Sequence, residues 1–389
     1  MYINIIKEKI IYFPLLSLFA GMIWLPQASK PFVGIVIFSV IFSMVFMRGA
    51  YIEYIKSNIQ GNTWMFIVFM SAVYSVFCYI KFGSSSQELR ALITSLVFLI
   101  FFNTNKLKLS DIQNLTFIAG ASVFFLLMYS FLWVDNLRLG LTSNPIVLAM
   151  HFGFLAIILM VMSTMEYEGK KLGFIIATML ILFSGMILTQ SRGPVVVALL
   201  IFTLFYIRFV KIIKFDYKLL ILFFLFMLTV FFLRDVITSR YHETNYEISR
   251  IYSGDLDSSI GLRIQMYTTG LKLFMTSPIF GVGDITYDKV NLINLTQDGL
   301  TFVLNSHLHN NYVDKLARGG LVGLLFFLSL LLYPILFAYK NKFKNKGLIL
   351  FPCLFFLLCS LFDSPFRNGD ILVFYLISIS LFLKSELYS

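Results

Sequence analysis

The sequence predicts an all-α fold, a polytopic membrane helical bundle of about twelve transmembrane helices with one long external (periplasmic) loop subdomain. Hydrophobic residues make up 59% of its 389 residues and aromatic residues 17%, well above the content of a soluble domain. The apolar residues recur in runs of roughly 16 to 23 residues, close to the length that crosses a bilayer as a helix. Lys and Arg are also divided unevenly between alternate loops, which is typical of a membrane protein of fixed orientation.

Each apolar run is expected to form one helix, with boundaries good to a few residues. The predicted spans are 10–26, 31–47, 64–80, 91–103, 112–134, 144–164, 172–189, 194–210, 219–233, 320–339, 347–362 and 371–387. They divide the chain into nine spans within residues 1–233, a periplasmic loop at 234–318 and three spans within 319–389.

The positive charges predict that both termini lie in the cytoplasm. With a cytoplasmic N-terminus, most Lys and Arg fall on the inner side, including the cluster between residues 340 and 346. The short external loops hold only Lys30, Lys81, Arg90, Arg138, Arg192 and Arg367. The net charge of +11 is therefore attributed to topology and to anionic membrane lipids, and no nucleic acid partner is expected.

The loop at 234–318 is the only segment long enough to hold structure outside the bilayer. Within it, apolar residues between Gly261 and Gly283 recur at helical spacing and end at Ser277 and Pro278. We expect an interfacial helix there. The predicted spans contain only three charged residues, Arg208, Lys384 and Glu386, each close to the cytoplasmic end of its span, which argues against an ion-coupled transporter.

Two arginines on the external face are candidate anion ligands. Arg192 stands in the tight turn Gln190-Ser191-Arg192-Gly193, and Arg263 lies on the expected interfacial helix. Arg192 could instead reach the lipid headgroups, and Arg263 could be a solvated surface residue. Together, two guanidinium groups could clamp a diphosphate and stabilise a leaving group that gains negative charge.

His309 is the candidate base. Drawn as one helix, residues 309–323 place His309, Val313, Leu316, Gly320 and Gly323 on one stripe, so that the glycines approach a neighbouring helix and the imidazole projects beside them. An unperturbed imidazole, with a pKa near ~6.5, suits removal of a proton from a hydroxyl at neutral pH.

The pair His307 and His309 also permits a metal site. Such a site needs further ligands at defined spacing, and the sequence offers only scattered candidates such as Asp298 and Asp314. The interpretation without a metal is preferred.

Several further residues are weaker candidates for substrate contact. Asp363 and Arg367 share the last external loop, where they could pair with each other or line the entrance for an acceptor. Lys81 and Arg90 flank another external loop and could contact lipid phosphate. His151 and the three cysteines Cys78, Cys353 and Cys359 lie in apolar spans, where packing is the expected role.

Three motifs resemble those of the bacterial O-antigen ligase family, within the O-antigen ligase and polymerase superfamily. His309-Asn310, nine residues and then Gly320-Leu321-Val322-Gly323 are similar to the ligase His-Asn-x9-Gly-x-x-Gly pattern. Thr189 to Gly193 resembles the arginine turn of the family, and Gly261 to Gly283 resembles its loop helix. Their order and separation extend the resemblance over most of the chain.

The resemblance implies a metal-independent, inverting glycosyltransferase of the membrane-embedded class in the bacterial inner membrane, with its active site on the periplasmic face. It implies a glycan donor linked to undecaprenyl diphosphate, a sugar hydroxyl of lipid A-core as acceptor, and no cofactor. Carried over by position, Arg192 and Arg263 would hold the diphosphate and His309 would activate the acceptor, with Gln190 and Asn310 contacting substrate.

Two alternatives stay open at this point. An O-antigen polymerase would use the same lipid-linked donor on both sides of the reaction. A polytopic lipid-glycan exporter would need an alternating-access pathway and ionisable groups near the midplane of the membrane, which the predicted spans lack.

Overall fold

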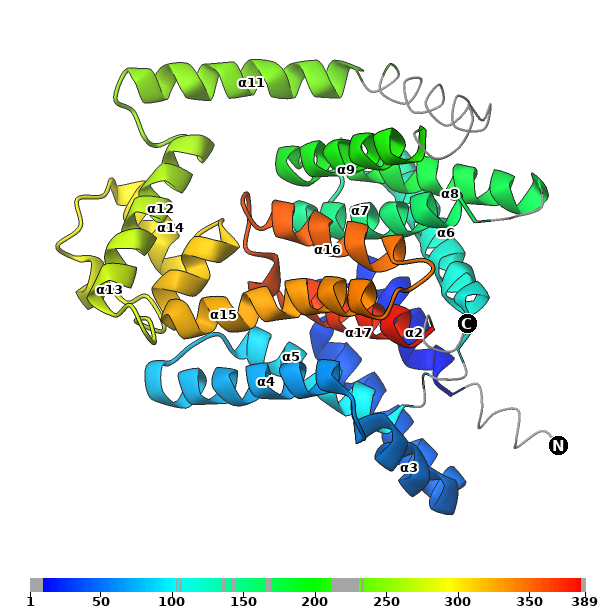
Figure 1. The fold of residues 1–389 in the computed structure, drawn as a ribbon. Coiled ribbons are helices and arrows are strands. Elements are labelled where there is room, and N and C mark those ends of the chain that lie inside the picture. Colours follow the sequence, from blue (N-terminus) through cyan, green and yellow to red (C-terminus); the bar gives the residue numbers. More distant parts are fainter. Residues whose placement is uncertain are drawn as a thin grey trace.

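The structure is a computed structural model, and it describes residues 10–102, 104, 107–134, 138–140, 144–165, 169–210, 231 and 234–385. Every regular element within these residues is a helix, as the sequence predicts. Long helices lie side by side in a bundle, and a group of shorter helices covers one end of it (Figure 1).

The predicted spans coincide with helices throughout the described part of the chain; span 219–233 lies outside it except for residue 231. The bundle helices are α2 (Tyr12–Phe19) with η1 (Gly21–Ile23), α3 (Ser29–Ile59), α4 (Thr63–Phe82), α5 (Ser86–Phe101), α6 (Leu109–Trp133), α7 (Pro145–Met162), α8 (Gly169–Leu188), α9 (Arg192–Val210), α15 (Asn311–Lys340), α16 (Gly347–Cys359) and α17 (Gly369–Ser385). Six of the described helices are long and apolar enough to cross a membrane.

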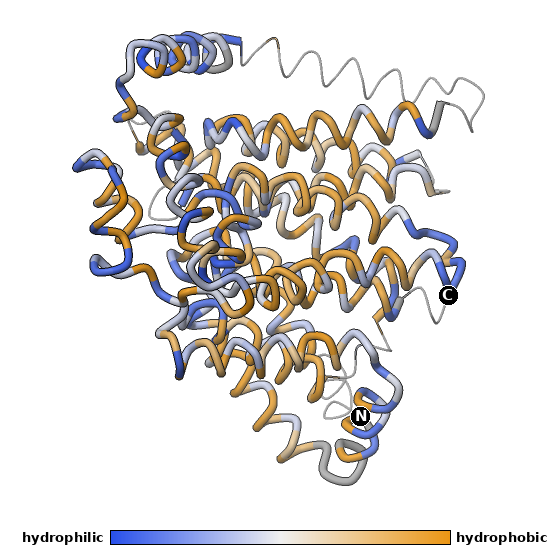
Figure 2. Tube along the Cα trace, turned by 60° about the vertical axis from the view of Figure 1, so that its left-hand side comes forward, coloured by the Kyte–Doolittle hydropathy of each residue, from blue (hydrophilic) through white to orange (hydrophobic). Residues whose placement is uncertain are grey.

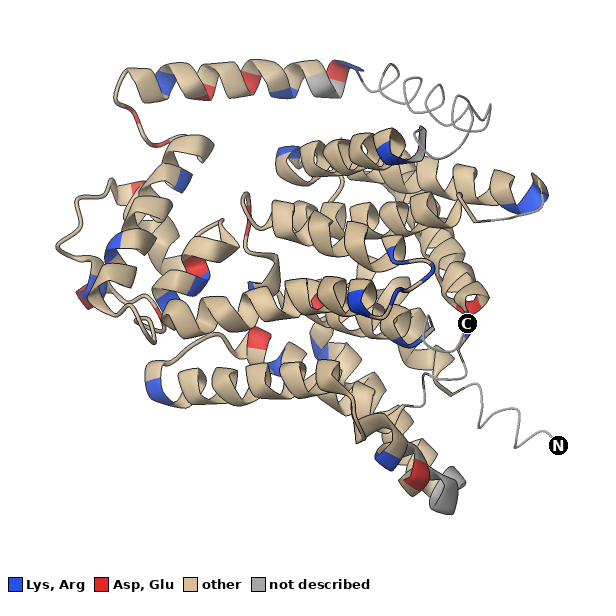
Figure 3. Ribbon diagram, in the orientation of Figure 1, with Lys and Arg blue, Asp and Glu red and all other residues tan. Residues whose placement is uncertain are grey.

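Helices α7 and α17 form the interior of the bundle. Both are apolar on every side, and nearly every side chain from Leu148 to Met162 and from Ile371 to Leu383 is buried. A helix without a polar face is stable where apolar neighbours or lipid surround it, and the burial of these two helices shows that here the neighbours are other helices. Apolar residues follow the length of the bundle helices, while polar residues gather at their ends (Figure 2). Basic residues mark the start of α8 and the loop between α15 and α16, at the end away from α12 (Figure 3).

The polar loop before α15 is itself helical. It contains α11 (Arg234–Tyr252), α12 (Ser259–Thr276), α13 (Tyr287–Val290) and α14 (Gln297–Asn305), and α12 agrees with the predicted interfacial helix. Helices α12, α13 and α14 share a small apolar core with the start of α15, and this core includes Met266, Leu273 and Val303. Helix α12 packs closely on the start of α15, because a Cβ on Gly270 would lie 2.5 Å from Cγ1 of Val313.

The expectation of one continuous helix from His309 to Gly323 is wrong at two places. Helix α15 begins at Asn311, and His309 lies before it with a left-handed φ of 48°. The helix then breaks at Gly320, where φ is 61°. The stripe of glycines that suggested helix packing therefore contains a backbone break.

The segment 278–283 is inserted at this break and forms hydrogen bonds with the backbone groups that the break leaves without helical partners. The amides of Val282 and Gly283 donate to the carbonyls of residues 317 and 318, and the amides of residues 321 and 322 donate to Pro278 and Ile279. Helix α12 is thereby joined to the membrane bundle. We refer to residues 278–283 as the insertion segment.

We predict that Gly320→Ala destabilises the protein. A Cβ there would lie 2.3 Å from the carbonyl oxygen of Ile279, and the left-handed backbone adds a strain of roughly 1–3 kcal/mol. Thermal unfolding of the purified protein in detergent should show a lower Tm. Gly319→Ala is the matched control, because its Cβ would make only an ordinary contact at 3.7 Å with Oη of Tyr74. Equal Tm values for the two variants would contradict the role given to the break.

Candidate functional site

The arginine turn lies at the start of α9. Gln190 adopts a left-handed φ of 56°, which turns the chain so that Arg192 becomes the first residue of the helix. Nη2 of Arg192 lies 3.0 Å from Oε2 of Glu243 and 3.1 Å from Oε1 of Glu247, both on α11. Arg192 therefore makes ion pairs and does not simply extend toward headgroups.

Arg192 and Arg263 line the same cavity. It has a volume of about 400 Å³, and its wall also includes Gln190, the third residue predicted for this place. Two more arginines line it, Arg138 and Arg240. We call this space the arginine cavity.

The residues from α11 were missed in the sequence analysis. Arg240, Glu243 and Glu247 follow one another at intervals of three and four residues, which puts them on one face of a helix. This spacing of charged residues is the feature of the sequence from which these three residues could have been identified. Arg240 donates to the side-chain oxygen of Gln190 and also pairs with Glu243.

The histidine turn, residues 307–309, is closed by a buried carboxylate. Nε2 of His307 lies 2.7 Å from Oδ1 of Asp363, and Nδ1 of His309 lies 3.1 Å from the same oxygen. The His309 contact is not aligned as a hydrogen bond, and we treat it as electrostatic. Asn310 caps α15, because its side-chain oxygen accepts from the amides of Tyr312 and Val313.

The two imidazoles stabilise the charge of Asp363. Burial raises the pKa of this carboxyl group, but the contacts with His307 and His309 outweigh burial and hold the pKa far below its usual range. For His307, burial lowers the pKa, while the Asp363 carboxylate outweighs it and the resulting pKa lies above the ordinary value. Asp363 is thus an ionised group that orients both histidines.

The arginine turn and the histidine turn meet through the loop at 361–363. A Cβ on Gly193 would lie 2.9 Å from Cβ of Phe362, so the start of α9 touches this loop directly. Phe362 lines the arginine cavity, and Asp363 follows it. His309 itself is not part of the cavity wall. It is connected to α12 through Tyr267, whose hydroxyl donates to the His309 carbonyl at 2.9 Å.

His307, His309 and Asp363 could also hold a metal ion. One ligand atom from each lies within 4.8 Å of the other two. The third ligand is therefore Asp363, and neither Asp298 nor Asp314 belongs to this group. Two histidines and one carboxylate are a ligand set that zinc accepts in enzymes.

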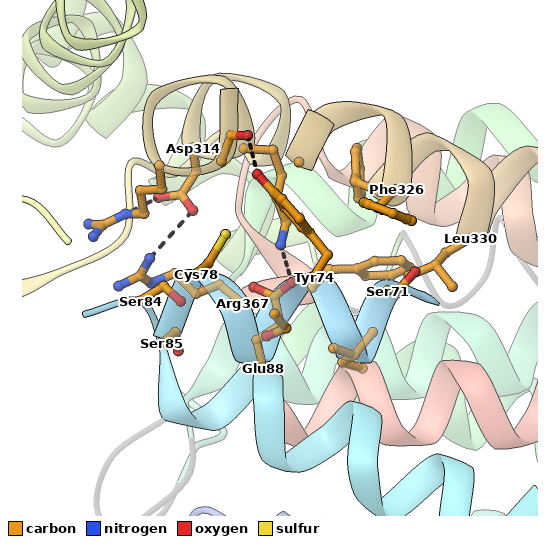
Figure 4. A pocket seen from close by; sticks show the side chains of 18 residues that line it. Ser71, Tyr74, Cys78, Ser84, Ser85, Glu88, Asp314, Phe326, Leu330 and Arg367 are labelled. Atoms are coloured by element: carbon orange, nitrogen blue, oxygen red, sulfur yellow. Dashed lines mark hydrogen bonds and ion pairs between the residues drawn. The ribbon is translucent and has the colours of Figure 1, made fainter. Parts of the chain in front are cut away.

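Arg367 contacts other carboxylates than the one in its own loop. Asp363 and Arg367 do not pair with each other: Arg367 lies 3.6 Å from Asp314 and 3.8 Å from Asp284. Together with Arg318, it lines a second and much smaller cavity of about 50 Å³ between α4, α5 and α15 (Figure 4).

This second cavity is surrounded by paired charges. Glu88 pairs with Lys315, and the Tyr74 hydroxyl donates to the Gly319 carbonyl beside the break in α15. Asp314 also accepts from the amide of Leu308 at 3.2 Å. Through this hydrogen bond, the charged groups at the second cavity help to hold the histidine turn in place. Lys81 and Arg90 do not line either cavity, so the structure does not bring them to the arginines.

His151 and the three cysteines are packed in the bundle interior, as expected. His151 is buried, lies 3.1 Å from the carbonyl of Phe19 and stacks on the ring of Phe374. The three cysteines are free and buried.

The fold and the site define a helical membrane protein with an arginine-lined cavity and a histidine–carboxylate cluster at one end of its bundle. Residues 177–328, which include the three motifs, match the family model described as O-antigen ligase (Wzy_C). This match covers less than half of the chain, and it agrees with the resemblance to the O-antigen ligase family that the motifs carry.

Two relatives match parts of the chain. The chain is 30% identical over 118 residues to a protein of Escherichia coli K12 named O-antigen ligase, covering 29% of this chain and 28% of that protein. It is 27% identical over 223 residues to an uncharacterized protein of Haemophilus influenzae, covering 54% of this chain. The chain matches about half the length of the Haemophilus protein.

We predict that His307 stabilises the protein in a pH-dependent way. Because its pKa is raised above the ordinary 6.5, its stabilisation is fully present below pH 6.5 and is lost as pH rises through the raised value. The Tm difference between wild type and His307→Asn should therefore be largest in acid and shrink toward alkaline pH. His242→Asn, an exposed substitution on α11, is the control. A difference for His307→Asn that stays constant with pH would refute the ion pair.

Proposed function

We propose that this protein is an O-antigen ligase that transfers a glycan from undecaprenyl diphosphate to a sugar hydroxyl of lipid A-core. The observation that supports it best is the meeting of the three motifs. Arg192 and Arg263 line one cavity, and the loop that carries Phe362 connects this cavity to His309.

The arginines have the chemistry to stabilise the leaving group. In a single displacement, the acceptor oxygen forms a bond to the anomeric carbon while the bond from that carbon to the diphosphate oxygen breaks. The diphosphate leaves with the electron pair and gains negative charge. Fixed guanidinium groups favour that charge most where it develops, which accelerates the step. One displacement inverts the configuration at the anomeric carbon.

His309 is placed to take the proton of the acceptor hydroxyl. Nδ1 of His309 faces Asp363 at 3.1 Å, so Nε2 is the ring nitrogen that would accept the proton of the hydroxyl. Asp363 would then stabilise the imidazolium that forms. The left-handed backbone at His309 fixes this direction, since Asn310 caps the helix that follows.

The location of the site suits substrates carried by lipids. The apolar flanks of the bundle helices face the bilayer, and the arginine cavity lies at the bundle end that carries α12. A polyprenyl tail could stay in the membrane while its diphosphate reaches the arginines. In this proposal the enzyme spans the inner membrane, the site faces the periplasm and both termini are cytoplasmic.

We predict that Arg192→Ala, Arg263→Ala and His309→Ala each abolish ligated polysaccharide. Removal of a charge-stabilising group or a general base costs roughly 10²-fold or more in rate. The measurement is glycan transfer by purified protein from a lipid-linked donor to lipid A-core. Lys272→Ala is the matched control, because it removes a basic residue from α12 that does not line the cavity.

The same assay separates the ligase from its alternatives. Full activity of His309→Ala would remove the proposed base. A polymerase would lengthen the lipid-linked glycan and leave the core acceptor unmodified, whereas an exporter would form no glycosidic bond.

We predict that transfer survives treatment with EDTA. The proposed chemistry needs fixed cations and a base, which Arg192, Arg263 and His309 supply. Activity that is lost with the chelator and restored by a divalent cation would instead assign the His307, His309 and Asp363 cluster to a metal ion. The inactive His309→Ala variant, treated in parallel, gives the background.

A further inference from the structure

The arginine cavity contains more charge than the two arginines of the motifs supply. Arg138 and Arg240 join Arg192 and Arg263 in its wall, and Glu243 and Glu247 face them. The described wall thus has four guanidinium groups and two carboxylates. A wall richer in guanidinium groups than in carboxylates suits an anionic ligand such as a diphosphate diester.

The two carboxylates are held in different ways. The Glu247 side chain is only 13% exposed, and its second oxygen accepts from the amide of Ile260 at the start of α12. Glu247 thus ties Arg192 to the helix that carries Arg263. The Glu243 side chain is 50% exposed, and its contacts in the cavity are the guanidinium groups of Arg192 and Arg240.

Glu243 therefore occupies a position that suits an anionic ligand. One of its oxygens, Oε2, contacts both guanidinium groups. A phosphate oxygen can bridge two guanidinium groups in the same way, and a diphosphate diester carries two negative charges where Glu243 carries one. Because Glu243 is half exposed, water can solvate its carboxylate once it leaves the arginines. The free-energy cost of replacing Glu243 with a ligand is therefore small.

We propose that Arg240 is a third diphosphate-binding residue and that Glu243 occupies the diphosphate site until the donor displaces it. This inference rests on the proposed function and adds α11 to the donor site. Since Arg240 and Glu243 are one turn apart, the same helix face supplies both the competing carboxylate and the additional cation. Arg240 also holds Gln190, so it connects α11 to the arginine turn.

The test uses the purified full-length protein and inorganic pyrophosphate, with affinity measured by calorimetry. We expect Arg240→Gln to weaken pyrophosphate binding roughly tenfold and Glu243→Gln to strengthen it about threefold or more. Asp235→Asn is the matched control, because it removes a carboxylate from the same helix that is 92% exposed and pairs only with its neighbour Arg234 among the described ion pairs. Its affinity should equal that of wild type.

A second arm distinguishes a diphosphate from a single lipid headgroup phosphate. Inorganic phosphate should bind at least tenfold more weakly than pyrophosphate, and equal affinities would overturn a diphosphate site. Unchanged pyrophosphate affinity in both Arg240→Gln and Glu243→Gln would also overturn the proposal. If a variant fails to fold, as judged by its Tm, Arg240→Lys or Glu243→Ala replaces it with the same expected direction.

The outcome is independent of glycan transfer. Pyrophosphate binding that responds as expected, in a protein that transfers no glycan, would retain the anion site and reject the proposed function. Transfer that depends on Arg192 and Arg263, together with unchanged pyrophosphate affinity in the α11 variants, would reject only the role of Arg240 and Glu243.

Discussion

The pairing of the insertion segment with the broken backbone of α15 fixes the position of the whole site. Four backbone hydrogen bonds join residues 278–283 to the two sides of Gly320. Helix α12 ends just before this segment, and the histidine turn lies just before α15. The same junction therefore sets where Arg263 and His309 stand relative to the bundle. Without it, the insertion segment would lose its backbone hydrogen bonds to α15.

Charge at this end of the bundle is balanced locally. Asp363 faces two imidazoles, Asp314 faces Arg318 and Arg367, and the glutamates of α11 face the arginine cavity. An unpaired charge next to an apolar bundle would be expensive to desolvate. Pairing offsets the free-energy cost of desolvating these charged groups and also orients them. The orientation is what a transfer reaction needs, since its groups must be in place before the charge develops.

Hydropathy predicted the membrane helices well, because each span is a long run of apolar residues whose length is set by the bilayer. The arginine and histidine motifs were also recognisable, since each stands at the end of such a run. The break at Gly320 could not be read in the same way. A glycine in an apolar segment is compatible with close helix packing and with a left-handed backbone, and only the inserted chain decides between them.

The partners within the site were harder to predict than the site residues. Asp363 lies 54 positions after His309, and nothing in local periodicity connects a loop to another loop so far away. Asp363 and Arg367 were expected either to pair with each other or to line an acceptor entrance, while the fold directs these two residues to different clusters. Arg240 and Glu243 had a readable helical spacing, but a charged helix face is usually solvated, so the spacing gave no reason to place them at a cavity.

The order of the helices has a consequence for biosynthesis. Helix α17 comes last in sequence among the described helices, yet it lies in the interior of the bundle, and the loop before it carries Asp363. As the ribosome delivers the chain to the membrane from its N-terminus, the earlier helices must leave a gap for this final hairpin. The histidine turn obtains its carboxylate only when that hairpin enters, so before that step His307 and His309 have no contact with Asp363.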